Sequence, residues 1–286
     1  MEKNNERESY LLDLDKILGP KLRKKLPRFV INFLKHRIHQ DDINNIIMAA
    51  EHYKGVKFFD DALKALNITY RIRGEEHLDT NRKYLFVCNH PLGGPEALII
   101  GSVFHRLYGE GFQVPVTPIM ANLKPLAEFF TPVNNLSSKQ SRDLGERIAK
   151  MFSSDQQVVV FPAGLCARKI NGKVTEMPWK KMFVTQSRRY ERDVVPVHIS
   201  GHNSKWYFFL CKLSKLLGLK INIGMLYLVD ELFKQCGNEF VITFGKPVPY
   251  TTFDKSKTDR EWAAEMQERV KALAEGNGCA MNMYVR

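Results

Sequence analysis

The chain has 286 residues, of which 44% are hydrophobic and 26% are charged, as is ordinary for a globular protein with a sizeable core. Its net charge of +12 predicts attraction to something acidic, such as an anionic membrane, an acidic carrier protein, nucleic acid or a phosphorylated substrate, although a basic soluble protein without such a partner fits the charge equally well. No run of about 18 apolar residues occurs, which excludes a membrane-spanning helix.

The cysteines favour a reducing compartment. They are Cys88, Cys166, Cys211, Cys236 and Cys279, an odd number without paired spacing. Neither a disulfide framework nor a zinc pattern fits them, so we expect no metal site. The first residues lack the apolar core of a signal peptide, and we therefore expect a cytoplasmic protein.

The first 66 residues are predicted to form a helical region. Residues 10–37 are expected to be helical, because apolar residues recur at helical spacing from Leu11 to Leu18, and two more short helices are expected over residues 41–66. Within the first segment, Lys21–Arg37 interleaves seven Lys or Arg with apolar side chains. Such a basic amphipathic stretch suits the surface of an anionic bilayer, and a solvated helix covering the core fits it equally well.

Residues 67–286 are predicted to form an α/β domain with a mixed, largely parallel sheet flanked by helices, because strands and helices alternate there. The expected strands cover residues 68–73, 83–88, 114–120, 157–162, 194–199 and 240–244, and the expected helices 96–108, 144–152 and 178–190. A capping box, Thr258-Asp-Arg-Glu261, opens a final helix. The aromatic stretch 206–219, which contains lysines, suits an interfacial segment, an acyl-chain lining or a core helix.

The first candidate site follows the expected strand Tyr84–Cys88, which runs into Asn89-His90-Pro-Leu-Gly-Gly-Pro-Glu96. Two glycines allow a sharp turn, and Pro95 suits the first position of a helix, which places Glu96 in its first turn. The turn thus brings a histidine toward a carboxylate, a pairing that suits a general base and its orienting acid. The alternative is a hydrogen-bonded histidine in an ordinary α/β turn.

The second candidate site repeats this pattern. The buried strand Val158–Phe161 enters Pro162-Ala-Gly164, and two cations, Arg168 and Lys169, follow. A glycine turn offers backbone N–H groups and a guanidinium offers a fork for phosphate. Ligands bind beyond the carboxyl ends of parallel strands, so we expect both turns at one edge of the sheet. For His198, His202 and Lys180, local hydrogen bonds or a solvated surface are the expected roles.

Three blocks of the sequence resemble the glycerolipid and lysophospholipid acyltransferase (PlsC-like) superfamily. They are Asn89-His90-Pro91 with Glu96, Phe161-Pro-Ala-Gly164 with Arg168, and Val195-Pro-Val197, and the resemblance covers roughly residues 67–250. The His-Pro-Leu-Gly-Gly and Phe-Pro-Ala-Gly forms are similar to a branch from Bacteroidota-type bacteria that is associated with acylating amino-acid lipids as well as lysophospholipids.

This resemblance implies that His90 removes a proton from the hydroxyl or amine of a lipid acceptor, which then attacks an acyl thioester of acyl carrier protein or coenzyme A. Glu96 would orient His90, and backbone N–H groups at Gly93–Gly94 or Gly164 would stabilise the oxyanion. The implied substrate-binding residues are Asn89, Gly93, Gly94, Phe161, Pro162, Gly164, Arg168, Lys169 and Arg142. No cofactor is implied besides the acyl thioester co-substrate.

The chain departs from the family pattern in three places. Five residues, not four, separate His90 from its acid, and this acid is Glu rather than Asp. Phe-Pro-Glu-Gly-Thr becomes Phe161-Pro-Ala-Gly-Leu165. The segment Phe130–Asn135 lacks the usual arginine, for which Arg142 is a candidate substitute. The acceptor is therefore open between a lysophosphatidate and a lyso-amino-acid lipid.

The expected partners are a lipid acceptor, a thioester carrier and an anionic membrane surface, with the protein peripheral on the inner face of the cell membrane. Nucleic acid is not expected, because no binding motif accompanies the charge. Two alternatives stay open: a non-enzymatic basic protein that docks on anionic membranes, and a thioesterase-like lipid hydrolase in which His90 activates water.

Overall fold

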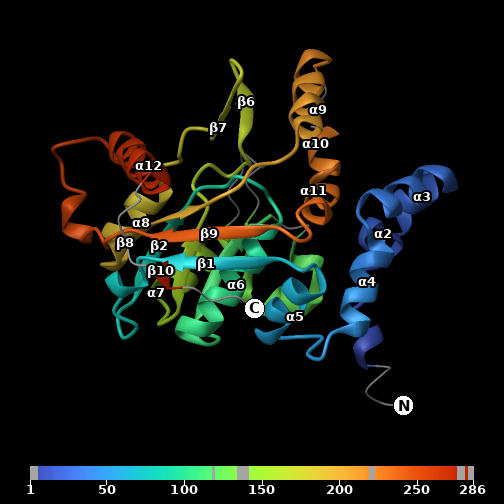
Figure 1. The fold of residues 1–286 in the computed structure, drawn as a ribbon, viewed down its shortest axis with the longest axis horizontal. Helices are drawn as coiled ribbons and strands as arrows, with labels where there is room; N and C mark the ends of the chain where they lie inside the picture. Colours follow the sequence, from blue (N-terminus) through green and yellow to red (C-terminus); the bar gives the residue numbers. More distant parts are fainter. Residues whose placement is uncertain (1–5, 118–119, 134–141, 219–222, 276–280, 283–286) are drawn as a thin grey trace.

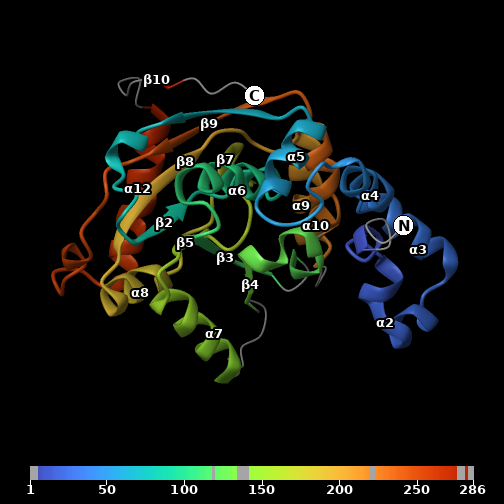
Figure 2. The ribbon, with the colours of Figure 1, turned by 90° about the horizontal axis from the view of Figure 1, so that it is seen from below.

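A computed structural model describes residues 6–117, 120–133, 142–218, 223–275 and 281–282. An eight-stranded sheet with helices on both faces forms the body of the protein (Figures 1 and 2). The strands are β1 (Thr69–Arg73), β2 (Tyr84–Cys88), β3 (Phe112–Val116), β4 (Phe130–Pro132), β5 (Gln157–Val160), β8 (Asp193–Ile199), β9 (Glu239–Phe244) and β10 (Met281–Asn282), while β6 (Arg168–Ile170) and β7 (Lys173–Thr175) form a separate hairpin.

The helices are α2 (Leu14–Lys25), α3 (Arg28–Arg37), α4 (Gln40–Ala49), α5 (Lys57–Ala65), α6 (Pro95–Tyr108), α7 (Arg142–Ser153), α8 (Met182–Tyr190), α9 (Lys205–Leu216), α10 (Ile223–Leu226), α11 (Leu228–Lys234) and α12 (Asp259–Glu275). Short 3-10 turns lie at η1 (Glu75–His77), η2 (Met120–Asn122), η3 (Lys124–Phe129) and η4 (Tyr250–Thr252). No helix of the described ranges is long and apolar enough to cross a bilayer.

The strand order is β10-β1-β9-β8-β2-β5-β3-β4. Strand β2 pairs in parallel with β8 and β5, β5 pairs in parallel with β3, and β9 runs antiparallel to β8. The predicted mixed, largely parallel α/β fold is therefore confirmed. Because β2, β5 and β8 run the same way, the segments that follow them meet at one edge of the sheet.

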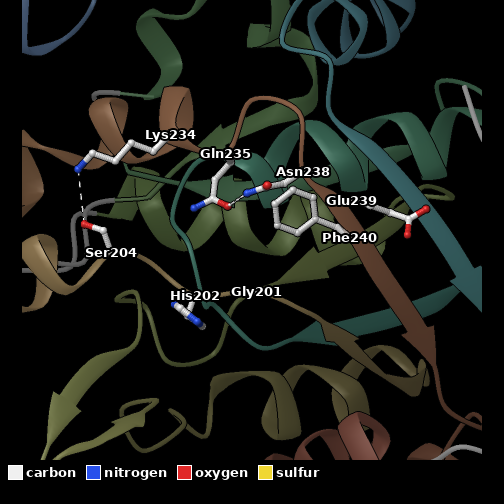
Figure 3. A pocket seen from close by; sticks show the side chains of 8 residues that line it. All are labelled: Gly201, His202, Ser204, Lys234, Gln235, Asn238, Glu239 and Phe240. Atoms are coloured by element: carbon white, nitrogen blue, oxygen red, sulfur yellow. Dashed lines mark hydrogen bonds between the residues drawn. The ribbon is translucent and has the colours of Figure 1, made fainter.

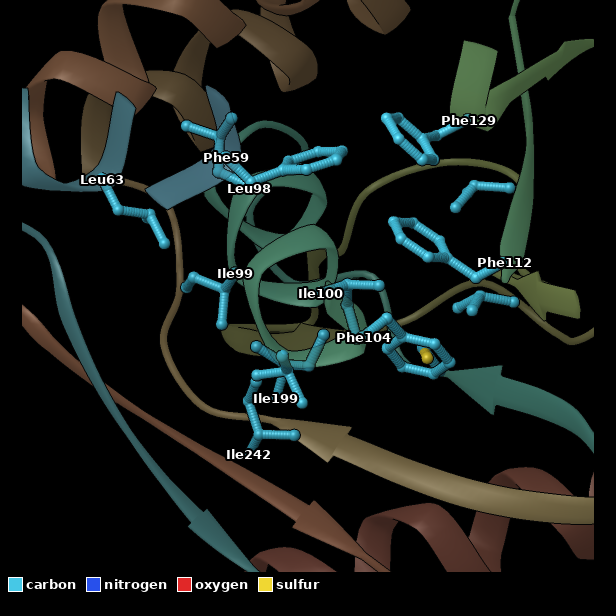
Figure 4. Packing of buried hydrophobic residues seen from close by; sticks show 14 of the residues in the cluster. Phe59, Leu63, Leu98, Ile99, Ile100, Phe104, Phe112, Phe129, Ile199 and Ile242 are labelled. Carbon is cyan, nitrogen blue, oxygen red and sulfur yellow. The ribbon is translucent and has the colours of Figure 1, made fainter. Parts of the chain in front are cut away.

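Two apolar clusters lie on the two faces of the sheet. Side chains alternate along a strand, so Phe86 joins the cluster under α5 and α6, while Leu85 and Val87 join the cluster under α8 and α12. Figure 4 shows the first cluster, with aromatic and aliphatic side chains surrounding α6. This double burial explains why β2 reads as a continuous apolar run.

The N-terminal helices α2 to α4 lie beside the sheet domain (Figure 1). The expected helical segment 10–37 is two helices, and the first is itself kinked at Gly19 (φ 68°) ahead of Pro20. At the end of α3, Arg37 donates to Asp230 of α11 at 3.0 Å, which fixes these helices to the domain. Helix α5 ends one residue before the domain boundary predicted at residue 66. It nevertheless packs against α6 within the main core of the sheet domain.

Two features of the fold were not predicted. Residues 168–175 form the β6–β7 hairpin, which lies next to α9 (Figure 1). Residues 223–234, for which we predicted no element, form the short helices α10 and α11. The strand expected over 114–120 ends at Val116, and part of its expected length lies outside the described residues.

Two Gly→Ala substitutions should change stability in opposite directions. A Cβ at Gly101 in α6 would overlap the ring of Phe59, which is fully buried among other aromatic rings, whereas a Cβ at Gly145 in α7 meets nothing within 4 Å. Gly101→Ala should lower the free energy of unfolding by about 1–3 kcal/mol through overpacking. Gly145→Ala should raise it by about 0.5–1 kcal/mol through the lower entropy of the unfolded chain.

Urea denaturation of both variants measures these changes. An unchanged midpoint for Gly101→Ala would show that Phe59 has room to move and would contradict the tight contact between α5 and α6.

Candidate active site

The predicted histidine and carboxylate meet at the sheet edge. His90 follows β2 and Glu96 lies in the first turn of α6, and His90 Nδ1 lies 3.2 Å from Glu96 Oε1. The Glu96 side chain is 1% exposed and that of His90 is 20% exposed. The acid is thus enclosed while the imidazole reaches solvent, as a base that must meet a substrate requires.

The turn itself holds the carboxylate. The N–H of Leu92 donates to Glu96 Oε1 at 2.5 Å, and the N–H of Gly93 donates to both carboxylate oxygens at 2.8 and 2.6 Å. Gly93 has a φ of 95°, a conformation that favours glycine, and a Cβ there would overlap the Cys166 sulfur. The longer turn and the longer acid therefore fit each other.

The charges of the pair stabilise each other. Burial raises the pKa of Glu96, but His90 and the backbone N–H groups outweigh burial and hold that pKa below its usual value. Burial lowers the pKa of His90, but Cys166 and Glu96 outweigh it and raise the pKa well above its usual value. When Nδ1–H donates to Glu96, Nε2 is left to accept a proton from a substrate.

The second turn packs onto the first. The N–H of Ala167 donates to the His90 carbonyl at 2.9 Å, the ring of Phe161 lies 4.8 Å from the imidazole, centroid to centroid, and Cys166 Sγ lies 3.7 Å from His90 Nε2. The expectation that both turns share one edge of the sheet therefore holds in the structure. Cys166 at the imidazole was not foreseen from the sequence.

A second carboxylate supports the histidine. Glu176 Oε1 accepts from the His90 backbone N–H at 2.7 Å, and Glu176 Oε2 accepts from Trp179 Nε1 at 2.9 Å. Burial raises the pKa of Glu176, although these hydrogen bonds oppose that change. The sequence offered no signal for Glu176, because it lies in a loop 86 residues beyond His90.

Arg168 is fixed beside the site by a tyrosine. Its Nη1 donates to the Tyr207 hydroxyl on the buried face of α9. Burial raises the pKa of Tyr207 well above its usual value, so the phenol stays neutral. Lys169, the next residue of β6, is exposed, whereas Lys180 reaches the second turn, since a Cβ at Gly164 would lie 3.0 Å from its Nζ. Two cations thus border the turns.

Several predicted binding residues shape the turns through their backbone contacts. Asn89 exchanges two hydrogen bonds with the backbone of Ile199 at 2.7 and 2.8 Å, which ties the end of β2 to β8. The carbonyl of the buried Pro162 accepts from Lys180 N, and the Gly164 N–H donates to the Phe161 carbonyl.

The Gly93 N–H donates to Glu96 and the Gly164 N–H donates to Phe161. Of the three glycines in the two turns, Gly94 is therefore the one whose N–H has no acceptor among the described residues. Arg142 begins α7, and its side chain lies outside the described part of the structure.

A separate open pocket of about 410 Å³ lies further along the same edge (Figure 3). It is lined by Gly201, His202, Ser204, Lys234, Gln235, Asn238, Glu239 and Phe240, and thus by neither His90 nor Glu96. His202 contacts the carbonyl of Asn203 at 3.0 Å, the local hydrogen bond expected of it, and burial lowers the pKa of His198. No group of three or more His, Cys, Asp or Glu that could hold a metal occurs among the described residues.

Comparison with known proteins identifies relatives along almost the whole chain. The profile of a family described as "Acyltransferase" matches residues 15–275. A lyso-glycine lipid O-acyltransferase of Bacteroides thetaiotaomicron is 41% identical over 92% of this chain and 98% of its own length. The protein of the same name from Phocaeicola vulgatus is 40% identical over 96% of this chain and 100% of its own length.

Among solved structures, the chain is similar to the 1-acyl-sn-glycerophosphate (LPA) acyltransferase PlsC from Thermotoga maritima, with a TM-score of 0.46 and 16% identity over 87% of this chain and 90% of that chain.

Glu96→Gln should lower the pKa of His90. The substitution removes the negative charge that favours the imidazolium, while the amide is close to the carboxylate in size. The His90 ring would then lose its proton at a lower pH than in the wild type. A titration of the histidine ring resonances by NMR measures the change, and His198, which this carboxylate does not contact, serves as the internal control. A His90 titration that stays in place would contradict the charge coupling.

Proposed function

Because the chain belongs to the acyltransferase family whose profile matches residues 15–275, we propose that it transfers a fatty acyl group from an acyl thioester to the hydroxyl oxygen of a lyso-glycine lipid. The observation that carries this proposal is the pair of His90 and the buried Glu96, whose Nδ1 and Oε1 atoms lie 3.2 Å apart at the mouth of the joined turns. The names of two relatives that are about as long as this chain support the acceptor class.

His90 is the general base of the proposed reaction. Its Nε2 takes the proton of the acceptor hydroxyl while the oxygen attacks the thioester carbonyl. The carbon–oxygen bond forms, the tetrahedral intermediate collapses, and the carbon–sulfur bond breaks. The departing thiolate then takes this proton from the imidazolium of His90, which Glu96 stabilises while it is charged. Direct transfer of this kind needs no enzyme nucleophile.

The intermediate requires a hydrogen-bond donor for its oxyanion. We assign this role to the Gly94 N–H at the start of α6, because Glu96 uses the N–H of Gly93 and the Phe161 carbonyl uses that of Gly164. The N-terminus of a helix adds a favourable dipole for negative charge.

Arg168 is the proposed anion-binding group for the acceptor. Tyr207 holds its guanidinium beside the second turn, and Lys180 adds a second positive charge near Gly164. A lipid built on the amino group of glycine retains a carboxylate, which a guanidinium binds through two parallel hydrogen bonds. The same site fits a lysolipid phosphate, so Arg168 alone does not separate the two acceptors.

The proposal also covers the acyl donor of the reaction and the cellular location of the protein. Acyl carrier protein or coenzyme A supplies the thioester, and the net charge of +12 favours the acidic carrier protein. A lipid acceptor places the protein on a membrane surface, and we propose the inner face of the cell membrane.

The decisive experiment combines purified protein, an acyl thioester and a lyso-glycine lipid, with the products identified by mass spectrometry. The wild type should form the O-acylated lipid, and His90→Ala should lose a factor of about 100 to 10,000 in kcat, the range of general-base catalysis. Free fatty acid as the main product would instead indicate a hydrolase.

Cys166→Ala tests the direct route in the same assay. If the acceptor attacks the thioester directly, the Cys166 thiol never carries the acyl group, so this variant should keep most of the wild-type kcat. A loss as large as that of His90→Ala, with an acyl chain trapped on the wild-type protein, would instead show transfer through the Cys166 thiol, which lies 3.7 Å from Nε2.

Arg168→Ala should raise KM for the lipid acceptor about 10- to 100-fold, the effect of losing hydrogen bonds to a charged group, and should lower kcat less. Arg168→Lys should recover only part of this loss, because an ammonium lacks the planar fork. Steady-state kinetics at varied acceptor concentration measure both effects. Arg189→Ala, the same change on the exposed surface of α8, is the control. An unchanged KM for Arg168→Ala would remove this residue from acceptor binding.

A further inference from the structure

Helix α9 exposes large apolar side chains to solvent. Leu216 is 79% exposed, Trp206 50% and Phe209 51%, and Leu217 directly after the helix is 58% exposed. At 100° per residue these four residues fall within an arc of about 100° on the helix surface. The opposite face carries the buried Tyr207. Helix α9 is therefore apolar both on the face that packs against the protein and on a face that is exposed to solvent.

The β6–β7 hairpin beside α9 also exposes apolar side chains. It contacts α9 through β6, and both elements stand on the same side of the sheet (Figure 1). Its Ile170 is 44% exposed and its Val174 47% exposed. We call these elements, with their exposed apolar residues and lysines, the α9–hairpin surface.

The charge of this surface has one sign. Five exposed lysines lie on it: Lys169, Lys173, Lys205, Lys212 and Lys215. Neither residues 165–175 nor residues 205–218 contain an Asp or Glu, and none of these lysines has an ion-pair partner within the described ranges. The surface therefore combines protruding apolar side chains with an unbalanced positive charge.

The N-terminal stretch that we first expected at the membrane differs in this respect. Arg23 and Lys35 both pair with Asp15, and Arg37 pairs with Asp230. Acidic residues of the protein thus neutralise part of its charge, although Phe29 and Phe33 of α3 are also exposed. Charge complementarity favours the α9–hairpin surface over α3.

We propose that the α9–hairpin surface docks the protein on an anionic lipid bilayer, with the apolar residues of α9 in the headgroup region and the lysines among the anionic lipids. This inference rests on the proposed function, because it names the membrane from which the lipid acceptor comes. A second copy of the chain is a poor occupant, since two such surfaces would repel each other.

Docking through α9 places the active site at the lipid. Tyr207 on the inner face of α9 holds Arg168, so one helix contacts the bilayer and positions the proposed anion-binding group. A lysolipid headgroup at the bilayer surface would then lie beside the two turns that carry His90 and Gly164.

Flotation of the full chain with vesicles tests the proposal. Phosphatidylcholine vesicles with roughly one third phosphatidylglycerol should bind the wild type, and pure phosphatidylcholine should bind it weakly. The double variant Phe209→Ser, Leu216→Ser should lose at least tenfold in vesicle affinity. Its matched control Phe29→Ser, Phe33→Ser on α3 should stay within about threefold of the wild type, because acidic residues partly neutralise the positive charge of that stretch and α3 lies outside the α9–hairpin surface. Both variants replace exposed side chains, and thermal unfolding verifies that they are folded.

The proposal would be overturned if the wild type did not float with anionic vesicles, or if the α9 variant bound vesicles like the wild type. It would also be overturned if the α9 variant kept its affinity for vesicles and lost its affinity for acyl carrier protein. Turnover of an acceptor dispersed in detergent separates this inference from the proposed function. Normal turnover by the α9 variant together with lost flotation supports docking, whereas a wild type that floats without any turnover leaves docking intact and refutes the proposed reaction.

Discussion

The arrangement of the site depends on one buried carboxylate. An ionised group removed from water is stable only when hydrogen bonds and an opposite charge replace its hydration. Glu96 obtains both from a single turn, through the N–H groups of Leu92 and Gly93 and the imidazole of His90. The conformation of the turn, its glycine at positive φ and the start of α6 together bring these donors to the carboxylate oxygens.

The parallel strands extend this constraint across the sheet edge. Because β2 and β5 end together, the turn after β5 reaches the histidine and donates to its carbonyl through Ala167. Glu176 accepts from the His90 N–H on the same side, so both polar groups of the His90 backbone are held by residues far away in the chain. His90 is thereby held by three segments of the chain: its own turn, the turn after β5 and the loop that carries Glu176.

Much of this arrangement is predictable from the sequence, and the reasons are local. The pattern of β2, the glycine turn and Pro95 at the helix start sufficed to place His90 opposite Glu96, because each signal acts within a few residues. The capping box at Thr258 was confirmed for the same reason. Tertiary contacts were not predictable: Glu176, Cys166 and Tyr207 reach the site through packing between distant segments, and the hairpin of residues 168–175 lacks the apolar alternation that marks a strand.

His90 follows the strand β2 by two residues, whereas Glu96 lies in the first turn of the helix α6. The two side chains meet only when α6 has docked on the sheet and Phe104 and Ile100 have joined the core. Docking of α6 on the sheet and assembly of the His90–Glu96 pair are therefore one event. In a partly folded chain His90 lacks the carboxylate that orients its Nδ1, so the same packing step that completes the core also fixes the imidazole.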